Sequence, residues 1–225
     1  MTGSLRATDL HKAYRRGREE VHALRGASIE VAPGELVALL GRSGSGKTTL
    51  LNCLLGWERP DTGEVDVPGA LEPGAAPWST VAVVPQQFGL VEELTLADNV
   101  ALPAGLAGLA DPRGAALETL AVLRLAHLAD RRLEEVSLGE QQRTALARAL
   151  VVRPRFLLAD EPTGRLDEDL ALHVMTTIRA LCADAGTGAL VASHDPAVVA
   201  AADRVVRLGD GAVAVAASSS TSETT

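Results

Sequence analysis

Residues 41–48, which read GRSGSGKT, combine glycine, lysine and threonine at a spacing that holds a phosphate chain, and they fit the pattern GxxxxGK[ST] in full. Glycines let the backbone curl so that several N–H groups converge on phosphate oxygens. Lys47 carries charge for the β- and γ-phosphates, and the Thr48 hydroxyl is a ligand for Mg²⁺. The sequence therefore predicts a nucleoside triphosphate site with Mg²⁺, formed by Gly41, Ser43, Gly44, Ser45, Gly46, Lys47, Thr48 and Thr49.

The segments that flank this loop have the character that phosphate binding requires. Residues 35–40 (ELVALL) form a nearly continuous apolar run, which is typical of a buried central strand. Residues 47–55 place four leucines on one face of a short helix that Gly56 can end in a left-handed conformation. The start of that helix adds its positive end to the loop, so both neighbours favour anion binding.

An acidic pair follows a second apolar strand. Residues 156–159 (FLLA) are followed directly by Asp160 and Glu161. An aspartate at this place can hold Mg²⁺ through water, and the adjacent glutamate can polarise an attacking water molecule. An ordinary acidic strand end is the alternative, and the phosphate loop upstream argues against it.

A helix start precedes the acidic strand. Residues 136–143 read VSLGEQQR, in which Ser137 and Glu140 form the capping box S-x-x-E. Free N–H groups and a positive helix end at such a start can bind an anion. With this segment the chain resembles the ABC ATPase family over nearly its whole length, because the family signature LSGGQ/E followed by QQR is similar to it.

The resemblance implies roles for further residues. Ser137 and Gly139 would contact the γ-phosphate of ATP held by a second subunit, and Lys47 and Glu161 would act in catalysis. A glutamine that senses Mg²⁺ and the attacking water is matched by Gln86 in VPQQF, with Gln87 as the alternative. The remaining matches are the adenine-stacking aromatic, the switch histidine and an interface aspartate, at Tyr14, His194 and Asp167 respectively. Together with Thr48, Asp160 and Gln86 would form the Mg²⁺ site.

The chain departs from the family pattern at three positions. Leu138 stands where the signature has its first glycine, Val136 where leucine is usual, and Arg165 where this branch has asparagine. A leucine adds bulk beside the phosphate, and a left-handed backbone there would cost roughly 1–2 kcal/mol. We therefore expect weaker capping of ATP, which implies either slow hydrolysis or a mixed dimer whose partner supplies the better signature.

Alternation of strands and helices predicts an α/β fold with a mainly parallel central sheet. The resemblance implies a P-loop NTPase with an N-terminal antiparallel β subdomain and an inserted α-helical subdomain. We expect one ABC ATPase domain at 1–217, with a RecA-like core at about 1–87 and 152–217 and a helical subdomain at about 88–151, before a disordered Ser/Thr tail at 218–225. The expected strands are 28–31, 35–40, 156–159, 189–193, 204–208 and 212–215, and the expected helices are 47–55, 115–129, 137–150 and 168–183.

Composition limits the partners. A net charge of −8 and a pI near 5.1 argue against nucleic acid. Cys53 and Cys182 lack metal-ligand spacing and are expected as buried thiols. No signal peptide opens the chain and no run reaches the roughly 18 apolar residues of a membrane span. The resemblance therefore implies a cytoplasmic subunit, peripheral on the cytoplasmic face of the membrane, that works with a transmembrane permease and a second ATP-binding subunit.

Residues 161–164 (EPTG), residues 193–195 (SHD) and the short chain resemble the branch of lipoprotein-release, macrolide-export, antimicrobial-peptide and cell-division subunits. Three other classes of protein share parts of this pattern. An ABC ATPase of DNA repair or translation would carry a long coiled coil, zinc cysteines or two cassettes, and a small phosphotransferase would lack the signature and the histidine. A non-catalytic or force-transmitting ATP-binding regulator stays open because of Leu138.

Overall fold

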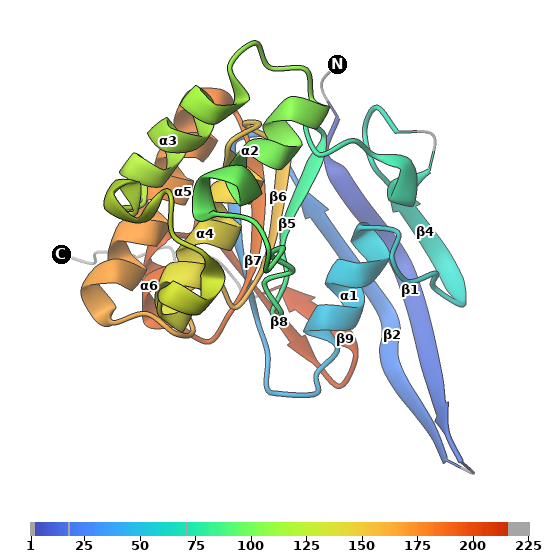
Figure 1. Ribbon diagram of the computed structural model, residues 1–225. Helices are drawn as coiled ribbons and strands as arrows, with labels where there is room; N and C mark the ends of the chain where they lie inside the picture. Colours follow the sequence, from blue (N-terminus) through green and yellow to red (C-terminus); the bar gives the residue numbers. More distant parts are fainter. Residues whose placement is uncertain (1–2, 18, 71, 216–225) are drawn as a thin grey trace, which may run out of the picture.

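A six-stranded sheet forms the centre of the computed structural model, which describes residues 3–17, 19–70 and 72–215 (Figure 1). The strand order is β5-β6-β7-β3-β8-β9, and all neighbours are parallel except β8 and β9. The mainly parallel sheet predicted from the sequence is confirmed. Its strands are β3 (Leu36–Leu40), β5 (Val81–Val84), β6 (Phe156–Asp160), β7 (Gly188–Ala192), β8 (Arg204–Gly209) and β9 (Ala212–Val215).

A second, antiparallel sheet has the order β2-β1-β4. Its strands are β1 (Leu5–Arg16), β2 (Glu19–Val31) and β4 (Thr62–Asp66), and β1 and β2 form a long hairpin that projects from the body of the molecule (Figure 1). Residues 28–31 were the only part predicted as a strand. The first four residues of β2 are exposed on both faces, so they lack the apolar alternation that would have revealed the strand.

The central sheet separates two hydrophobic cores. One face packs against α1 (Lys47–Leu54) and the antiparallel sheet, through residues such as Leu39, Leu50 and Ile29. The other face packs against the remaining helices, through residues such as Ala38 and Leu146. Those helices are α2 (Leu96–Leu106), α3 (Pro112–Val122), α4 (Leu138–Leu150), α5 (Glu168–Ala185) and α6 (Pro196–Ala201).

Three of these helices, α2, α3 and α4, lie between β5 and β6 in the chain, where the sequence predicted a helical insertion. Two details of the prediction were wrong. The helix expected at 115–129 ends at Val122, because Arg124 turns the chain with φ 59° and so allows Leu123 and Leu125 both to be buried. Helix α2 was not predicted, since it contains Pro103, a residue that normally ends helices.

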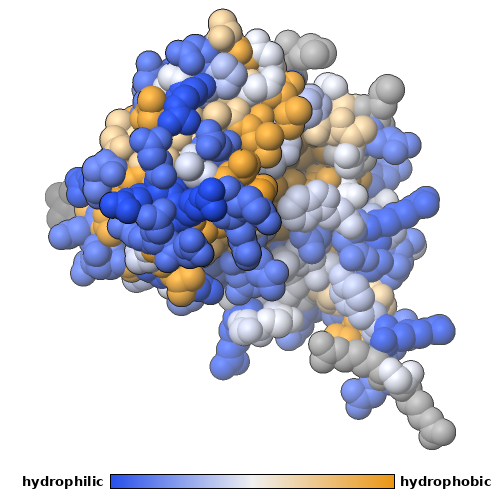
Figure 2. Space-filling view, in the orientation of Figure 1, coloured by the Kyte–Doolittle hydropathy of each residue, from blue (hydrophilic) through white to orange (hydrophobic). Residues whose placement is uncertain are grey.

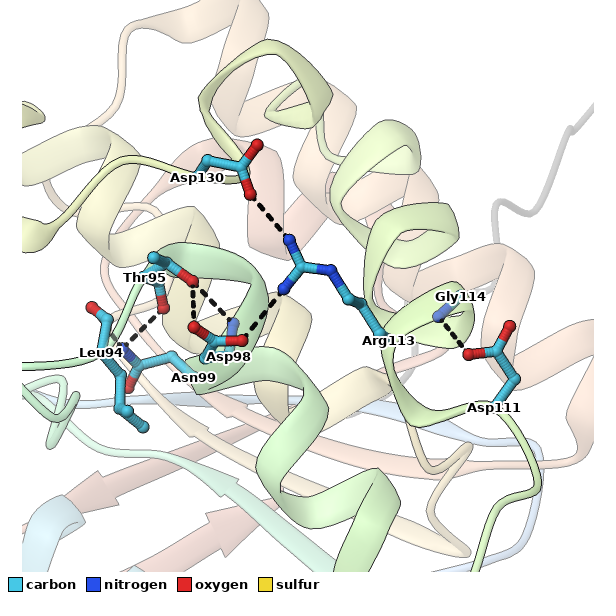
Figure 3. Close-up of polar contacts among 8 residues, drawn as sticks. All are labelled: Leu94, Thr95, Asp98, Asn99, Asp111, Arg113, Gly114 and Asp130. Carbon is cyan, nitrogen blue, oxygen red and sulfur yellow. Dashed lines mark hydrogen bonds and ion pairs between the residues drawn. The ribbon is translucent and has the colours of Figure 1, made fainter.

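Polar contacts fix the beginning of this insertion (Figure 3). Thr95 caps α2 by accepting from the N–H of Asp98, and the buried Asn99 bonds both backbone groups of Val91. Arg113 at the start of α3 pairs with Asp98 at 3.0 Å and with Asp130 at 2.7 Å (Figure 3). These contacts tie α2, α3 and the loop before α4 into one unit.

Several smaller expectations have a clear outcome. Cys53 and Cys182 are buried free thiols, and burial raises the pKa of each to about 11. Gly56 has φ 69° just after α1, as a left-handed helix stop requires. Among the described residues, no helix combines the length and the apolar character that crossing a bilayer demands. The Ser/Thr tail predicted at 218–225 lies outside the described residues.

Candidate nucleotide-binding and catalytic site

A cleft of about 930 Å³ opens at the carboxyl ends of β3 and β6, where ligands collect in parallel α/β sheets. It brings together most of the residues singled out in the sequence. These are Tyr14, Gly41, Ser43, Gly44, Gly46, Lys47, Thr48, Thr49, Gln86, Asp160, Glu161 and His194. Gln86 lines the cleft and the alternative, Gln87, is not among its lining residues.

The phosphate loop depends on glycine at Gly46. Its φ is 102°, and a Cβ there would lie 2.3 Å from the carbonyl oxygen of Ala23 in β2, so no other residue fits. Lys47 Nζ donates to the carbonyl oxygen of Gly41 at 2.8 Å, which holds the ammonium over the loop. Ser45 is buried and its hydroxyl has no hydrogen-bond partner among the described residues.

Thr48 and Asp160 meet although they lie 112 residues apart. Thr48 Oγ1 donates to Asp160 Oδ2 at 2.7 Å. Burial raises the pKa of Asp160, and the bond from Thr48 opposes that rise. The described residues hold no cluster of three or more His, Cys, Asp or Glu that could bind a metal alone. Mg²⁺ at a triphosphate takes most ligands from phosphate and water and one or two from protein, so this pair of oxygen donors fits it.

Glu161 lies at the end of β6 with φ 53°, a left-handed conformation that is uncommon for a residue with a side chain. Its N–H donates to the carbonyl oxygen of Ala192 at 2.8 Å. One carboxylate oxygen accepts from Ser193 Oγ at 2.9 Å and the other lies 3.0 Å from His194 Nδ1. Strained backbone of this kind clusters at functional sites, and here the neighbouring strand end holds a carboxylate in the cleft.

Ser137, Gly139 and Asp167 do not line this cleft, and neither does the buried Ser45. Ser137 caps α4, and its capping box with Glu140 is present as the sequence predicted. A Cβ at Gly139 would lie 3.2 Å from the carbonyl oxygen of Arg165, so this glycine permits close packing beside residues 161–167. Asp167 caps α5 by accepting from the N–H of Leu170 at 2.9 Å. The tip of α4 at Ser137 and Gly139 therefore lies outside the lining of the nucleotide cleft of its own chain.

The strain considered for Leu138 is absent. Leu138 is the first residue of α4 and is not among the residues with positive φ. Its side chain is 54% exposed beside Ser137. Any effect of this leucine on a nucleotide must therefore come from the bulk of the side chain and not from the backbone.

The cleft also contains residues that sequence reasoning did not assign to it. Arg165 lies with its guanidinium 5.4 Å from the ring centre of Phe88, two residues after Gln86 in the chain. Gln142 contacts the acidic strand end, and its place in the QQR motif was the only available signal. Ser193 is not among the lining residues, but it holds Glu161 by a hydrogen bond and could have been found from its position before His194. The other unassigned lining residues are Ala23, Arg42 and Gly164.

A triphosphate loop, a hydrogen-bonded Thr–Asp pair and a glutamate held beside a histidine, at the carboxyl ends of a parallel sheet, define an ATP-binding cassette. Residues 24–164 match the sequence profile of the ABC transporter family, and the chain belongs to that family. The chain is 39% identical over 218 residues to the lipoprotein-releasing system ATP-binding protein LolD of Paramagnetospirillum magneticum, covering 92% of this chain and 96% of that protein.

Two further similarities extend the comparison. The chain is 42% identical over 220 residues to the macrolide export ATP-binding/permease protein MacB of Chlorobium luteolum, which covers 94% of this chain and 33% of that protein. Among solved structures, the ATP-binding cassette MJ0796, described as dimeric and bound to ADP and Pi, has a TM-score of 0.87 and 32% identity, with 93% and 96% of the two chains covered.

Proposed function

We propose that this chain hydrolyses ATP with Mg²⁺ at two sites in a dimer, and that nucleotide-driven closure of the dimer drives a separate transmembrane permease. The observation that carries the proposal is the division of the site. Lys47, Thr48, Asp160 and Glu161 meet in one cleft, whereas the signature tip at Ser137 lies outside it. A second subunit that places its own tip over the triphosphate completes the site.

The chemistry follows from the positions of the side chains. The glycine loop and Lys47 bind the phosphates. Thr48 and Asp160 would hold Mg²⁺, which would neutralise negative charge on the triphosphate. Glu161 accepts a proton from water as the water oxygen bonds to the γ-phosphorus. The bond between the γ-phosphorus and the bridging oxygen breaks, and ADP and phosphate leave. His194, beside Glu161, and Gln86 orient the γ-phosphate and the water.

The second subunit supplies groups that one chain lacks. The first turn of α4 presents backbone N–H groups suited to an anion. The Ser137 hydroxyl donates to the Glu140 carboxylate at 2.8 Å and would exchange that bond for one to the anion. Gly139 packs against Arg165 and Leu166, which directly precede Asp167, and we assign Gly139 and Asp167 to the proposed interface. The dimeric structure of the similar cassette MJ0796 supports this arrangement. Homodimers and mixed dimers both satisfy it.

An apolar groove beside the cleft fits the permease. It has a volume of about 540 Å³, and its lining includes Trp57, Trp78, Leu102 and Leu106. Leu106 is 83% exposed and Trp57 is 60% exposed. Figure 2 shows apolar side chains gathered over α2, in the upper middle of the view. We assign the groove to an apolar cytoplasmic segment of the permease, which places this subunit on the cytoplasmic face of the membrane.

The groove connects to the ATP site through Arg148 of α4. Arg148 lies 5.6 Å from the ring centre of Trp78, and its Nη atoms donate to the carbonyl oxygens of Gly89 at 2.6 Å and Phe88 at 2.8 Å. Gln86 lies two residues before Phe88. Movement of the nucleotide-sensing loop would therefore reach the groove. The names of the relatives support export or lipoprotein handling as the transport task.

The change Glu161→Gln tests the catalytic part of the proposal. Loss of the proton acceptor should lower turnover by about 10²- to 10⁴-fold. MgATP should then accumulate a dimer that light scattering detects. The matched control is Glu64→Gln, on the exposed β4, which should leave turnover unchanged. Rapid hydrolysis by Glu161→Gln would contradict the assigned role, and no hydrolysis by the unchanged chain would favour the regulator that Leu138 suggests.

A second pair of variants tests the groove. Leu106→Asp should abolish co-purification with the polytopic partner and leave the ATP turnover of the isolated chain intact. Leu117→Asp on α3, which is 39% exposed outside the groove, is the control and should bind normally. Equal binding by both variants would place the permease elsewhere.

A further inference from the structure

We propose that Gln142 is a positioning residue for Glu161, and that it links the tip of α4 to the catalytic carboxylate of the same chain. The inference rests on the proposed function, in which that tip caps ATP on a second subunit. Through Gln142, closure of the dimer at one ATP site would then affect the rate of hydrolysis at the other ATP site.

Both polar atoms of the Gln142 side chain are used. Nε2 donates to the carbonyl oxygen of Glu161 at 2.6 Å, and Oε1 accepts from the N–H of Arg165 at 3.2 Å. The side chain is almost fully buried, with 3% of the residue exposed. One amide on α4 therefore spans residues 161–165, the segment that carries the acidic strand end toward Asp167.

Glu161 needs such a support because of its backbone. Its φ of 53° is disfavoured for a residue with a Cβ, and such conformations persist only where surrounding groups hold them. Ala192 holds the N–H of Glu161 at 2.8 Å. Ser193 and His194 hold its carboxylate. Gln142 holds its carbonyl oxygen and is the only one of these contacts that comes from a helix of the insertion.

Ser137 at the tip of α4 and Gln142 lie close together along the helix. Ser137 and Gln142 are five positions apart, which is roughly 7 Å at a rise of about 1.5 Å per residue. The capping box of Ser137 and Glu140 stabilises the intervening turn. Because a helical turn is stiff, a shift or rotation of the tip on contacting the partner's ATP moves the Gln142 amide with it. The orientation of Glu161 then depends on whether the opposite site is occupied.

The geometry also indicates which kinetic constants change. Gln142 contacts backbone atoms of Glu161 and Arg165, and none of its hydrogen bonds goes to the phosphate loop. Loss of the amide should therefore leave ATP affinity nearly unchanged. It should reduce kcat and remove the dependence of one site on the other.

The test is Gln142→Met, which keeps the length and burial of the side chain and removes both hydrogen bonds. With Mg²⁺ and increasing ATP, we expect kcat to fall at least tenfold, KM to change less than twofold, and the Hill coefficient to fall to one from a wild-type value above one. Gln141→Met is the matched control, since Gln141 bonds the carbonyl oxygen of Leu133 at 2.8 Å and does not contact Glu161.

The double variant Ser137→Ala, Gln142→Met separates linkage from local support. If Gln142 transmits contact at the tip, the two changes should lower kcat by less than the product of their single effects. If Gln142→Met fails to fold, Gln142→Glu, which retains an acceptor for Arg165 and loses the donor to Glu161, makes the same measurement. A fall in kcat with an unchanged Hill coefficient, or an unchanged kcat, would overturn the inference. A wild-type chain that hydrolyses no ATP would instead overturn the proposed function.

Discussion

Replacement of Leu138 by glycine should raise activity and lower stability at the same time. In the proposed dimer, the exposed leucine side chain stands between the first turn of α4 and the partner's triphosphate. Its removal allows Ser137 and the free N–H groups to approach. One additional hydrogen bond to a charged phosphate is worth about 1.5–3 kcal/mol. That value corresponds to roughly a 10- to 100-fold rise in the population of the ATP-bound dimer.

The stability cost follows from burial and backbone. The side chain is 54% exposed, so about half of the roughly 2 kcal/mol from burying a leucine is lost. Glycine in a helix adds about 0.5–1 kcal/mol. The sum of roughly 2 kcal/mol should lower Tm by about 4–8 °C in a chain of this size. Differential scanning calorimetry measures this change, and ATP turnover with light scattering measures the gain.

The variant Leu138→Ala distinguishes two explanations for weak capping of ATP, the bulk of the leucine side chain and the limited freedom of its backbone. Because Leu138 lies in ordinary helical geometry, alanine should give most of the gain in dimer population and a smaller loss of Tm than glycine. If alanine changed nothing while glycine raised turnover, backbone freedom would be the cause and the reasoning from bulk would be wrong. If neither variant changed turnover or dimer population, the leucine would have no effect on capping.

Three further predictions concern single contacts. Tyr14→Ala should raise the Kd for ATP by roughly 5- to 100-fold in a fluorescence titration. Tyr14→Trp should bind ATP with a Kd near that of the wild type. An unchanged Kd for the alanine variant would show that adenine does not stack there. Arg148→Met should lower the free energy of unfolding in urea by about 2–4 kcal/mol, since two backbone carbonyls lose their donor, whereas Arg131→Met, which breaks an exposed ion pair with Glu135, should cost under about 1 kcal/mol. Burial raises the pKa of the Cys53 and Cys182 thiols to about 11, so the folded chain should resist alkylation at pH 8. Unfolded thiols ionise near pH 8.5, so the free energy of unfolding should fall as pH rises from about 8.5 to 11. The fall should be less steep when both cysteines are replaced by alanine.

The sequence predicted the elements that carry dense local signals. Residues 41–48 fix their own conformation through glycine, and the helix at Ser137 begins with a capping box, so both were found in place. The meeting of Thr48 with Asp160 was expected from the resemblance, which implied that both residues hold one Mg²⁺ ion. The parallel sheet itself followed from the alternation of strands and helices.

What sequence reasoning missed depends on tertiary contacts. The first four residues of β2 are exposed on both faces and have no apolar period. Helix α2 forms in spite of Pro103 because its apolar side packs into the core. Arg124 adopts a left-handed conformation although it is not glycine, so the sequence did not indicate the turn at this position. Gln142 looked like an ordinary residue of a helix, and only the fold places its amide against Glu161.

The contact of Gly46 with Ala23 has a consequence for the order of events. The phosphate loop rests directly on the backbone of β2, and β2 pairs with β1 where Tyr14 lies opposite Val21. The proposed platform for the base at Tyr14 and the proposed cradle for the phosphates thus both rest on β2. A nucleotide that arrives on a lone subunit finds its pocket already shaped, so little conformational entropy is lost in this first step. In the proposed dimer, conformational entropy is lost mainly in the later step, when two ATP-bound subunits associate.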